Sequence, residues 1–140
     1  MSEDGFLYHV AIAVKDIGKA EDIYSKLLGL RVIHREDVVN YGVKTSMLRS
    51  KSGEGTAIEL IEPLDENSPI SEFLKKRGEG VHHICFLVDD IESSLEALKK
   101  EGVRLIDEHP RPGSYNCKVA FIHPKSMNGV LVELAEKIKD

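Results

Sequence analysis

The chain has 140 residues and a formal net charge of −5, and this length is typical of one ordinary domain. The negative charge argues against nucleic acid as the main partner, because phosphate backbones are bound by an excess of Lys and Arg. There is no apolar stretch of membrane-spanning length and no signal-peptide pattern. We therefore expect a cytoplasmic protein, without a nucleic-acid or membrane partner, whose two cysteines are free thiols.

The first predicted elements are a strand and a helix. Apart from His9, the residues from Tyr8 to Val14 are all apolar, and the two-residue period of a strand places His9 on the same side as two alanines. Small neighbours leave space beside the imidazole, so this side can face a concave site. Asp16 is a typical helix N-cap, apolar residues then recur at helical spacing, and Gly29 is a typical C-terminal stop.

Three extended runs follow this helix, at residues 31–36, 43–49 and 57–61. Residues 63–80 then form a connector. Within it, Ser68-Pro69 combines an N-cap residue with proline at the first helical position, which predicts a short helix.

The same order of elements recurs from residue 81. A strand leads to Asp90, which is again a typical N-cap, a helix runs to Gly102, and extended runs follow at 104–107, 118–123 and 130–134. We therefore predict an α+β protein of two tandem βαβββ modules. The first module covers about 5–62 and the second about 81–136, within a single domain of residues 1–140.

A translation of 74 residues relates the two halves. It carries His9 onto His83 and Glu59 onto Glu133, and several of their neighbours match as well. A duplication places equivalent residues at pseudo-symmetric positions, so these four side chains are predicted to converge between the halves. Two imidazoles and two carboxylates suit a divalent metal ion.

The sequence around the two glutamates supports this interpretation. Glu59 and Glu133 are each flanked by aliphatic residues, and a carboxylate buried in such a strand is costly unless it is paired or bound to a metal. The alternative is that each lies on an exposed strand face or pairs with a nearby lysine. The repeat selects His83 over the adjacent His82, which must point to the opposite face. The histidines without a counterpart under the shift are expected to be surface or structural residues: His34, His109 and His123.

Several segments resemble the vicinal oxygen chelate superfamily and, within it, the methylmalonyl-CoA epimerases. They are His9-Val10-Ala11, Asn67-Ser68-Pro69-Ile70, Gly80-Val81-His82-His83-Ile84, and His123-Pro124-Lys125-Ser126 followed by Gly129-Val130-Leu131-Val132-Glu133-Leu134. The resemblance covers nearly the whole chain, and the last two motifs together are fairly specific to the epimerases. It implies paired βαβββ modules that form a cupped mixed sheet around a metal site.

The resemblance also implies an activity. The metal ligands would be His9, Glu59, His83 and Glu133, and they would hold one divalent ion per chain, such as Co2+, Zn2+, Ni2+ or Mn2+. The enzyme would epimerise (R)- and (S)-methylmalonyl-CoA by removing the proton α to the thioester, through a metal-stabilised enolate. An acyl-CoA substrate and a homodimer are implied as well.

Inversion at carbon requires a proton carrier on each face of the substrate. The pseudo-symmetry suggests Glu133 for one face and Glu59 for the other. Some members of the family have Gln at the position of Glu59. A further carboxylate, which some epimerases have three residues after the glycine of a Gly-Val pair, falls on Thr45 here. A hydroxyl cannot serve as that base at neutral pH.

Two other functions remain open at this stage. Glyoxalase I has a similar His/Glu ligand set, and it isomerises a hemithioacetal through a metal-stabilised enediolate. A ligand-binding protein of the antibiotic-resistance type has the same fold and needs no complete metal set. The four ligand-type residues argue against this second alternative.

Overall fold

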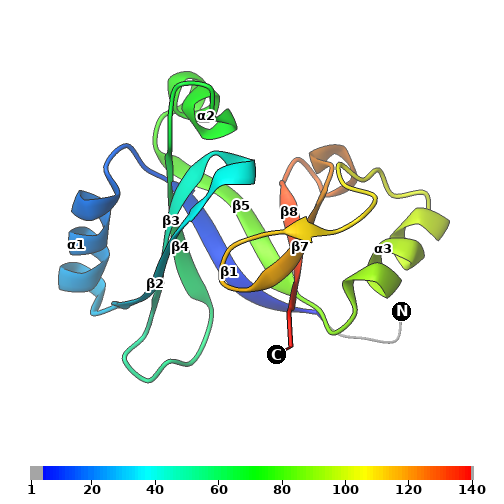
Figure 1. The fold of residues 1–140 in the computed structure, drawn as a ribbon, viewed down its shortest axis with the longest axis horizontal. Coiled ribbons are helices and arrows are strands. Elements are labelled where there is room, and N and C mark those ends of the chain that lie inside the picture. The colour runs from blue at the N-terminus through cyan, green and yellow to red at the C-terminus, as the bar shows by residue number, and fades with distance from the viewer. Residues whose placement is uncertain (1–4, 140) are drawn as a thin grey trace. The chain divides into compact units, whose positions relative to one another are not determined.

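The computed structural model describes residues 5–139 (Figure 1). Its helices and strands, in chain order, are β1 (Phe6–Ala13), α1 (Ile17–Leu28), β2 (Arg31–Val38), β3 (Val43–Arg49), β4 (Ala57–Pro63), α2 (Pro69–Arg77), β5 (Gly80–Leu87), α3 (Ile91–Lys100), β6 (Arg111–Pro112), β7 (Cys117–Ile122) and β8 (Val132–Lys137). The described chain divides into two compact units, one from His9 to His82 and the other made of residues 83–139 together with residues 5–8. None of the three helices found in residues 5–139 combines the length and the apolar character that crossing a membrane requires.

The first unit is a four-stranded sheet with a helix packed on each face. Its strand order is β2-β3-β4-β1, in which β1 and β4 are parallel and the other neighbours are antiparallel. Helix α1 packs on one face through Ala20, beside Leu48 and Leu60. Helix α2 packs on the other face through Ile70, beside Ala11. The alternation of side chains along the strands separates the two small cores.

The bulge in β2 changes which of its side chains share a face. Val32 is paired with Leu48 and His34 with Met47, so Ile33 is an extra residue on this strand. In an unbroken strand, Val32 and His34 would point to the same side of the sheet. The bulge instead leaves Val32 in the core under α1 and turns His34 to the opposite face.

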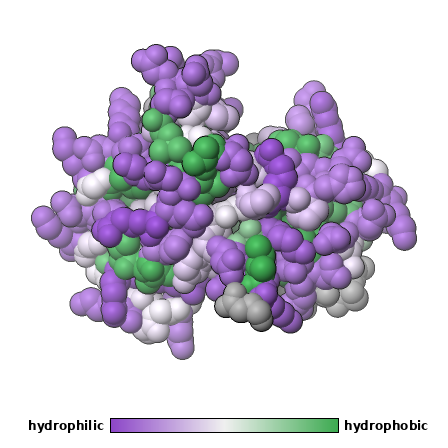
Figure 2. Space-filling model, viewed as in Figure 1, coloured by the Kyte–Doolittle hydropathy of each residue, from purple (hydrophilic) through white to green (hydrophobic). Residues whose placement is uncertain are grey.

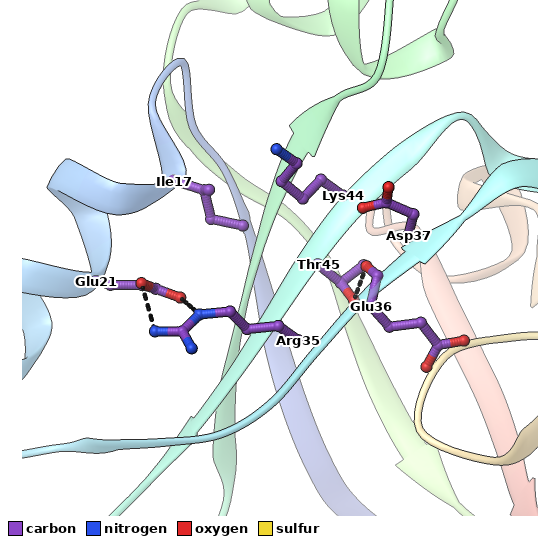
Figure 3. Close-up of a pocket in the computed structure, with 7 residues that line it drawn as sticks. All are labelled: Ile17, Glu21, Arg35, Glu36, Asp37, Lys44 and Thr45. Atoms are coloured by element: carbon purple, nitrogen blue, oxygen red, sulfur yellow. Dashed lines mark hydrogen bonds and ion pairs between the residues drawn. The ribbon is translucent and has the colours of Figure 1, made fainter.

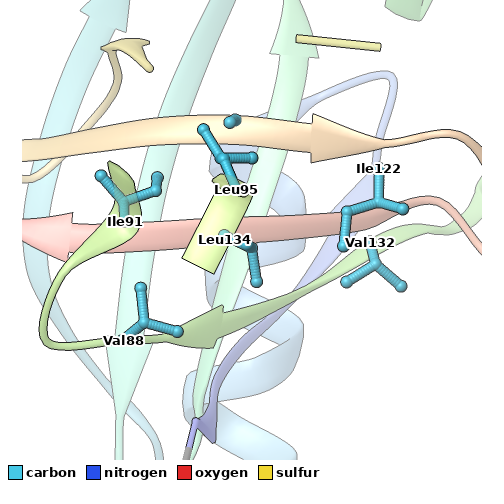
Figure 4. Packing of buried hydrophobic residues seen from close by; sticks show 7 residues of the cluster. Val88, Ile91, Leu95, Ile122, Val132 and Leu134 are labelled. Atoms are coloured by element: carbon cyan, nitrogen blue, oxygen red, sulfur yellow. The ribbon is translucent and has the colours of Figure 1, made fainter. Parts of the chain in front are cut away.

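The second unit has the strand order β5-β8-β7-β6, with β5 and β8 parallel and the other neighbours antiparallel. Figure 4 shows its core, in which Ile91 and Leu95 of α3 pack against Ile122, Val132 and Leu134 of the sheet. Both helix residues are almost completely buried. The burial of this apolar face therefore fixes α3 on its sheet.

The 74-residue shift relates contacts as well as residues. The Glu62 carboxylate accepts a hydrogen bond from the backbone N–H of Ile17 at 2.9 Å, and the Glu136 carboxylate accepts one from that of Ile91 at 2.8 Å. In each unit a carboxylate of the last strand thus satisfies an N–H group at the start of the unit's helix, where intrahelical acceptors are lacking. The same kind of hydrogen bond therefore joins the last strand to the helix start in both units.

The predicted α+β class and the order of elements in each half are confirmed. Asp16 and Asp90 are N-caps, Ser68 caps α2, and Gly29 ends α1 with the left-handed φ of 71° that favours glycine.

The predicted strand at residues 104–107 is wrong. Only Leu105 makes an isolated bridge there, and the short strand β6 lies further along the chain. The N–H groups of Ile106 and Asp107 both donate to the carbonyl oxygen of Phe121, and the Asp107 carboxylate accepts from the Phe121 N–H. A side chain therefore takes the place of a backbone partner in the ladder.

The surface seen in Figure 2 is mostly hydrophilic, with hydrophobic residues in separate patches. Helix α1 exposes Leu27 and Leu28, at 75% and 65% of their full accessible area. The two cysteines, Cys85 and Cys117, are buried, as expected for small core residues.

Candidate metal and active site

The first unit holds a buried contact between a histidine of β1 and a glutamate of β4. His9 Nε2 lies 3.3 Å from Glu59 Oε1, and the two side chains are only 5% and 6% exposed. In the parallel pairing of these strands Ala11 is opposite Glu59 and Ala57 is opposite His9. Both partners are small residues, so the imidazole and the carboxylate can approach each other across the face of the sheet.

The second unit repeats this arrangement between β5 and β8. His83 Nε2 lies 3.1 Å from Glu133 Oε1, and both side chains are again buried. Cys85 is opposite Glu133, just as an alanine is opposite the glutamate of the first unit. The Phe121 ring packs edge-on against the His83 ring, with 5.3 Å between the ring centroids, and holds the imidazole in place.

Each pair fits a divalent ion by its chemistry and its spacing. Imidazole nitrogen and carboxylate oxygen bind zinc and related metals at about 2.0–2.2 Å. Two ligand atoms at such distances from one ion are roughly 3.0–3.4 Å apart for the angles found in octahedral and tetrahedral sites. The separations of 3.3 Å and 3.1 Å lie in this range. His9 and Glu59 are therefore suitable as two ligands, and so are His83 and Glu133.

The other predicted roles of histidine can be compared with the structure. His82 is half-buried and packs edge-on against Phe73, with 4.9 Å between the ring centroids. His123 caps a short turn, where its Nδ1 accepts the N–H of Lys125. Partial burial lowers the pKa of His123, and the charges of Arg104 and Lys125 add to this effect. This histidine is structural, as expected.

One ionisable pair was missed by reasoning from the sequence. His34 Nε2 lies 2.8 Å from Glu36 Oε1, and each side chain is 35% exposed. In the register of β2 and β3, Glu36 is opposite Thr45 and His34 is opposite Met47. The 74-residue shift gives no counterpart for this pair. A local signal does exist, since His34 and Glu36 are two residues apart in a strand and so share a face.

The structure shows where the Thr45 side chain lies and what its hydroxyl binds. Its side chain is buried, and its hydroxyl donates a hydrogen bond to the backbone carbonyl of Glu36 at 2.9 Å. The hydroxyl thus holds β2 against β3.

A groove of about 490 Å³ lies where α1 crosses β2 and β3, and Figure 3 shows its lining. It is lined by Ile17, Glu21, Arg35, Glu36, Asp37, Lys44 and Thr45. Arg35 extends toward α1 and pairs with Glu21 at 2.8 Å, whereas Glu36 points away from that helix. The hydrogen bond from Arg35 lowers the pKa of Glu21. The groove includes neither His9 nor Glu59, so we do not assign it to the metal.

Comparison with known proteins identifies the family. Residues 8–121 match the Glyoxalase/Bleomycin resistance protein/Dioxygenase superfamily. The chain is 46% identical to the mitochondrial methylmalonyl-CoA epimerase of Dictyostelium discoideum over 95% of this chain and 79% of the relative. It is 39% identical to the crystal structure of methylmalonyl-CoA epimerase from Mycobacterium tuberculosis, with a TM-score of 0.90 and coverage of 95% and 88% of the two chains.

A second similar structure contains methylmalonyl-CoA. This methylmalonyl-CoA epimerase, in complex with methylmalonyl-CoA and NH4+, is 34% identical, with a TM-score of 0.88 and coverage of 95% of this chain and 94% of the other. The match thus extends over nearly the whole chain in sequence and in structure. The chain belongs to the methylmalonyl-CoA epimerase family of the glyoxalase/bleomycin resistance/dioxygenase superfamily, and it is an isomerase.

Proposed function

We propose that this protein is a metal-dependent enzyme that interconverts (R)- and (S)-methylmalonyl-CoA. The observation that carries the proposal is the pair of buried His/Glu contacts, one in each unit, related by the 74-residue shift in a chain of this family. One divalent ion per chain, for example Co2+, Zn2+, Ni2+ or Mn2+, is held by His9, Glu59, His83 and Glu133. The substrate is an acyl-CoA thioester, and the protein acts as a homodimer.

The reaction removes one proton from the α-carbon and adds one proton to the opposite face of the same carbon. A carboxylate takes the α-proton, the electrons of the broken C–H bond shift toward the thioester carbonyl, and a carboxylic acid on the opposite face returns a proton to the carbon. We assign Glu133 to one face and Glu59 to the other, because the repeat relates these two residues. When bound, the divalent ion stabilises the negative charge that develops on the thioester oxygen.

Supplying the purified protein with two alternative substrates tests this function. The metal-loaded protein should epimerise methylmalonyl-CoA, lose this activity after treatment with a chelator, and regain it with a divalent transition metal. The hemithioacetal of methylglyoxal and glutathione is the second substrate. Turnover of the hemithioacetal alone would assign the protein to glyoxalase, and full epimerisation by rigorously metal-free protein would remove the metal from the proposal.

A further inference from the structure

Helix α1 exposes two apolar side chains that are not needed to hold it on its sheet. Ile23 and Leu27, one turn apart, are 54% and 75% exposed. The 74-residue shift carries them onto Ala97 and Glu101 at α3. Helix α3 packs on its sheet through buried residues such as Leu95. A helix in this position therefore packs without the apolar pair, which points to a contact of α1 outside the single chain.

A groove of about 520 Å³ lies on the same side of α1. Ile23 and Tyr24 line it from the helix, and Ile12 and Val14 of β1 line it from the sheet. The other lining residues also belong to the first unit: Lys15, Asp16, Lys19, Ala20, Glu79 and Gly80. Leu27 thus projects next to a groove with apolar side chains on both walls. A surface with both features can bind its own copy, because twofold symmetry places each projection against the other copy's groove.

Two charged residues lie beside the apolar pair, Asp22 and Lys26. Both are exposed, and within the described part of the chain neither side chain has an ion pair or a hydrogen bond. In an antiparallel pair of α1 helices centred on Tyr24, Asp22 of one copy is level with Lys26 of the other, and symmetry repeats this pairing. Charges of both signs on one side of the helix suit a second copy better than a partner of a single charge sign.

The same register also places the projecting leucine. Leu27 follows Lys26 by one residue, so in the antiparallel pair it is level with Glu21, which precedes Asp22 by one residue. The α1 residues that line the groove lie around this level: Ala20, Ile23 and Tyr24. The pairing of the charges and the contact of Leu27 with the groove therefore require one and the same arrangement of the two helices.

We propose that the homodimer forms through this side of α1, made of Ile23, Leu27 and the groove beside them. The inference rests on the proposed function for the presence of a homodimer, and it specifies the surface by which two chains associate. The two α1 helices pack antiparallel about a twofold axis, and each Leu27 enters the groove of the other copy. Burial of the apolar side chains drives association, and Asp22 and Lys26 fix the register.

Sedimentation velocity at several protein concentrations tests the apolar contact. The unaltered protein should be a dimer. Leu27→Glu should weaken its association by about a hundredfold or more, because a carboxylate would have to enter the apolar groove. Leu27 is largely exposed in the single chain, so the substitution should leave the stability of the chain itself nearly unchanged. Circular dichroism checks that the variant is folded.

The matched control is an exposed apolar residue of the same unit outside α1. Val39 is 79% exposed, and Val39→Glu introduces the same carboxylate. This variant should associate as tightly as the unaltered protein.

An exchange of charges tests the antiparallel register. Asp22→Lys gives this side of α1 two lysines, and Lys26→Asp gives it two aspartates. Each variant alone brings like charges together and should associate about tenfold more weakly than the unaltered protein. When the two variants are mixed, each lysine faces an aspartate, so heterodimers should form with nearly the original affinity. An effect within one chain would not be relieved by mixing.

The outcomes are distinct. A Leu27→Glu variant that dimerises normally would overturn this surface and leave the homodimer to another one. Charge variants that associate no better when mixed would overturn the antiparallel pairing. A monomeric unaltered protein would overturn the interface and the homodimer together. Epimerisation of methylmalonyl-CoA is assayed separately on the unaltered protein, and its absence from a dimer that passes the other tests would remove the proposed activity but not the interface.

Discussion

At the scale of single residues, Glu59 and Glu133 each have two proposed roles, as metal ligand and as proton carrier. Replacing either by Gln should slow inversion of both epimers by about 10²-fold or more, since each direction uses both groups. The remaining carboxylate can still remove the proton on its own side. Exchange of the α-proton in heavy water should therefore survive for one epimer in Glu59→Gln and for the other epimer in Glu133→Gln.

Metal analysis of the same samples separates the two roles. Loss of the ion would abolish both exchange and inversion, so only variants that keep the metal are informative. If Glu59→Gln keeps its metal and inverts the substrate at the normal rate, Glu59 is a ligand alone.

Asp90 makes one unit's stability depend on pH. Its carboxylate accepts hydrogen bonds from the backbone N–H and the hydroxyl of Ser93 at the start of α3, and the backbone hydrogen bond is the main reason that its pKa is lowered. A carboxyl group with a lowered pKa in the folded state contributes stability above its ordinary value near 3.9. This contribution is lost as the pH falls through the lower, folded value.

Replacement of the cap tests this sign. Asp90→Ala should lower the free energy of unfolding at pH 7, because it removes the N-cap of α3. The difference from the unaltered protein should shrink in acid, where the unaltered carboxyl group is protonated too. Urea unfolding at pH 7 and near pH 3 measures this, with Asp89→Ala as the neighbouring control. A difference that stays constant with pH would show that the charge of Asp90 does not matter.

At the scale of elements, α3 is fixed by its buried face. Leu95 is 1% exposed in the core of the second unit, whereas Leu27 on α1 is 75% exposed. Leu95→Ala removes packed side-chain volume and should destabilise the protein by about 2–5 kcal/mol. Leu27→Ala, the same substitution at the surface, should change stability by less than about 0.5 kcal/mol. Equal effects in denaturant unfolding would contradict this account of α3.

The elements also show what can be predicted from sequence. Helix caps such as Asp16 and Ser68 depend on neighbouring residues in the chain, so they were predicted correctly. The strand predicted at 104–107 failed because Asp107 competes for the partner strand through its side chain. The face of His34 depends on a bulge that exists only in the pairing of β2 with β3. The pattern of residues along one strand does not predict how that strand pairs with its neighbour.

At the scale of the molecule, the proposal that both units bind the same ion predicts the number of ions bound per chain. The unaltered protein should bind one ion per chain and gain about 2.7 kcal/mol of stability when the free ion is at 100 times its Kd. His9→Ala and His83→Ala lie in different units, yet each should abolish most of this gain. His109→Ala, at an exposed histidine, is the control and should retain it.

Metal analysis and thermal unfolding together decide this point. Binding of two ions per chain, with one lost in each variant, would mean that each unit holds its own ion and would contradict the shared site. The shift of 74 residues identified the two His/Glu contacts from sequence alone, because a repeat preserves equivalent positions. It could not identify His34 and Glu36, which have no counterpart in the second unit.

The two units differ in whether they are built from one continuous segment of the chain or from two. The first is one continuous stretch, from His9 to His82, whereas the described part of the second combines residues 83–139 with residues 5–8. Tyr8 belongs to this second unit, where its ring lies 5.7 Å from the Lys137 ammonium near the end of the chain. Domains generally fold in order as they leave the ribosome. We therefore expect the contact between His9 and Glu59 to form first during translation, while that between His83 and Glu133 can form only after residue 133 has been synthesised.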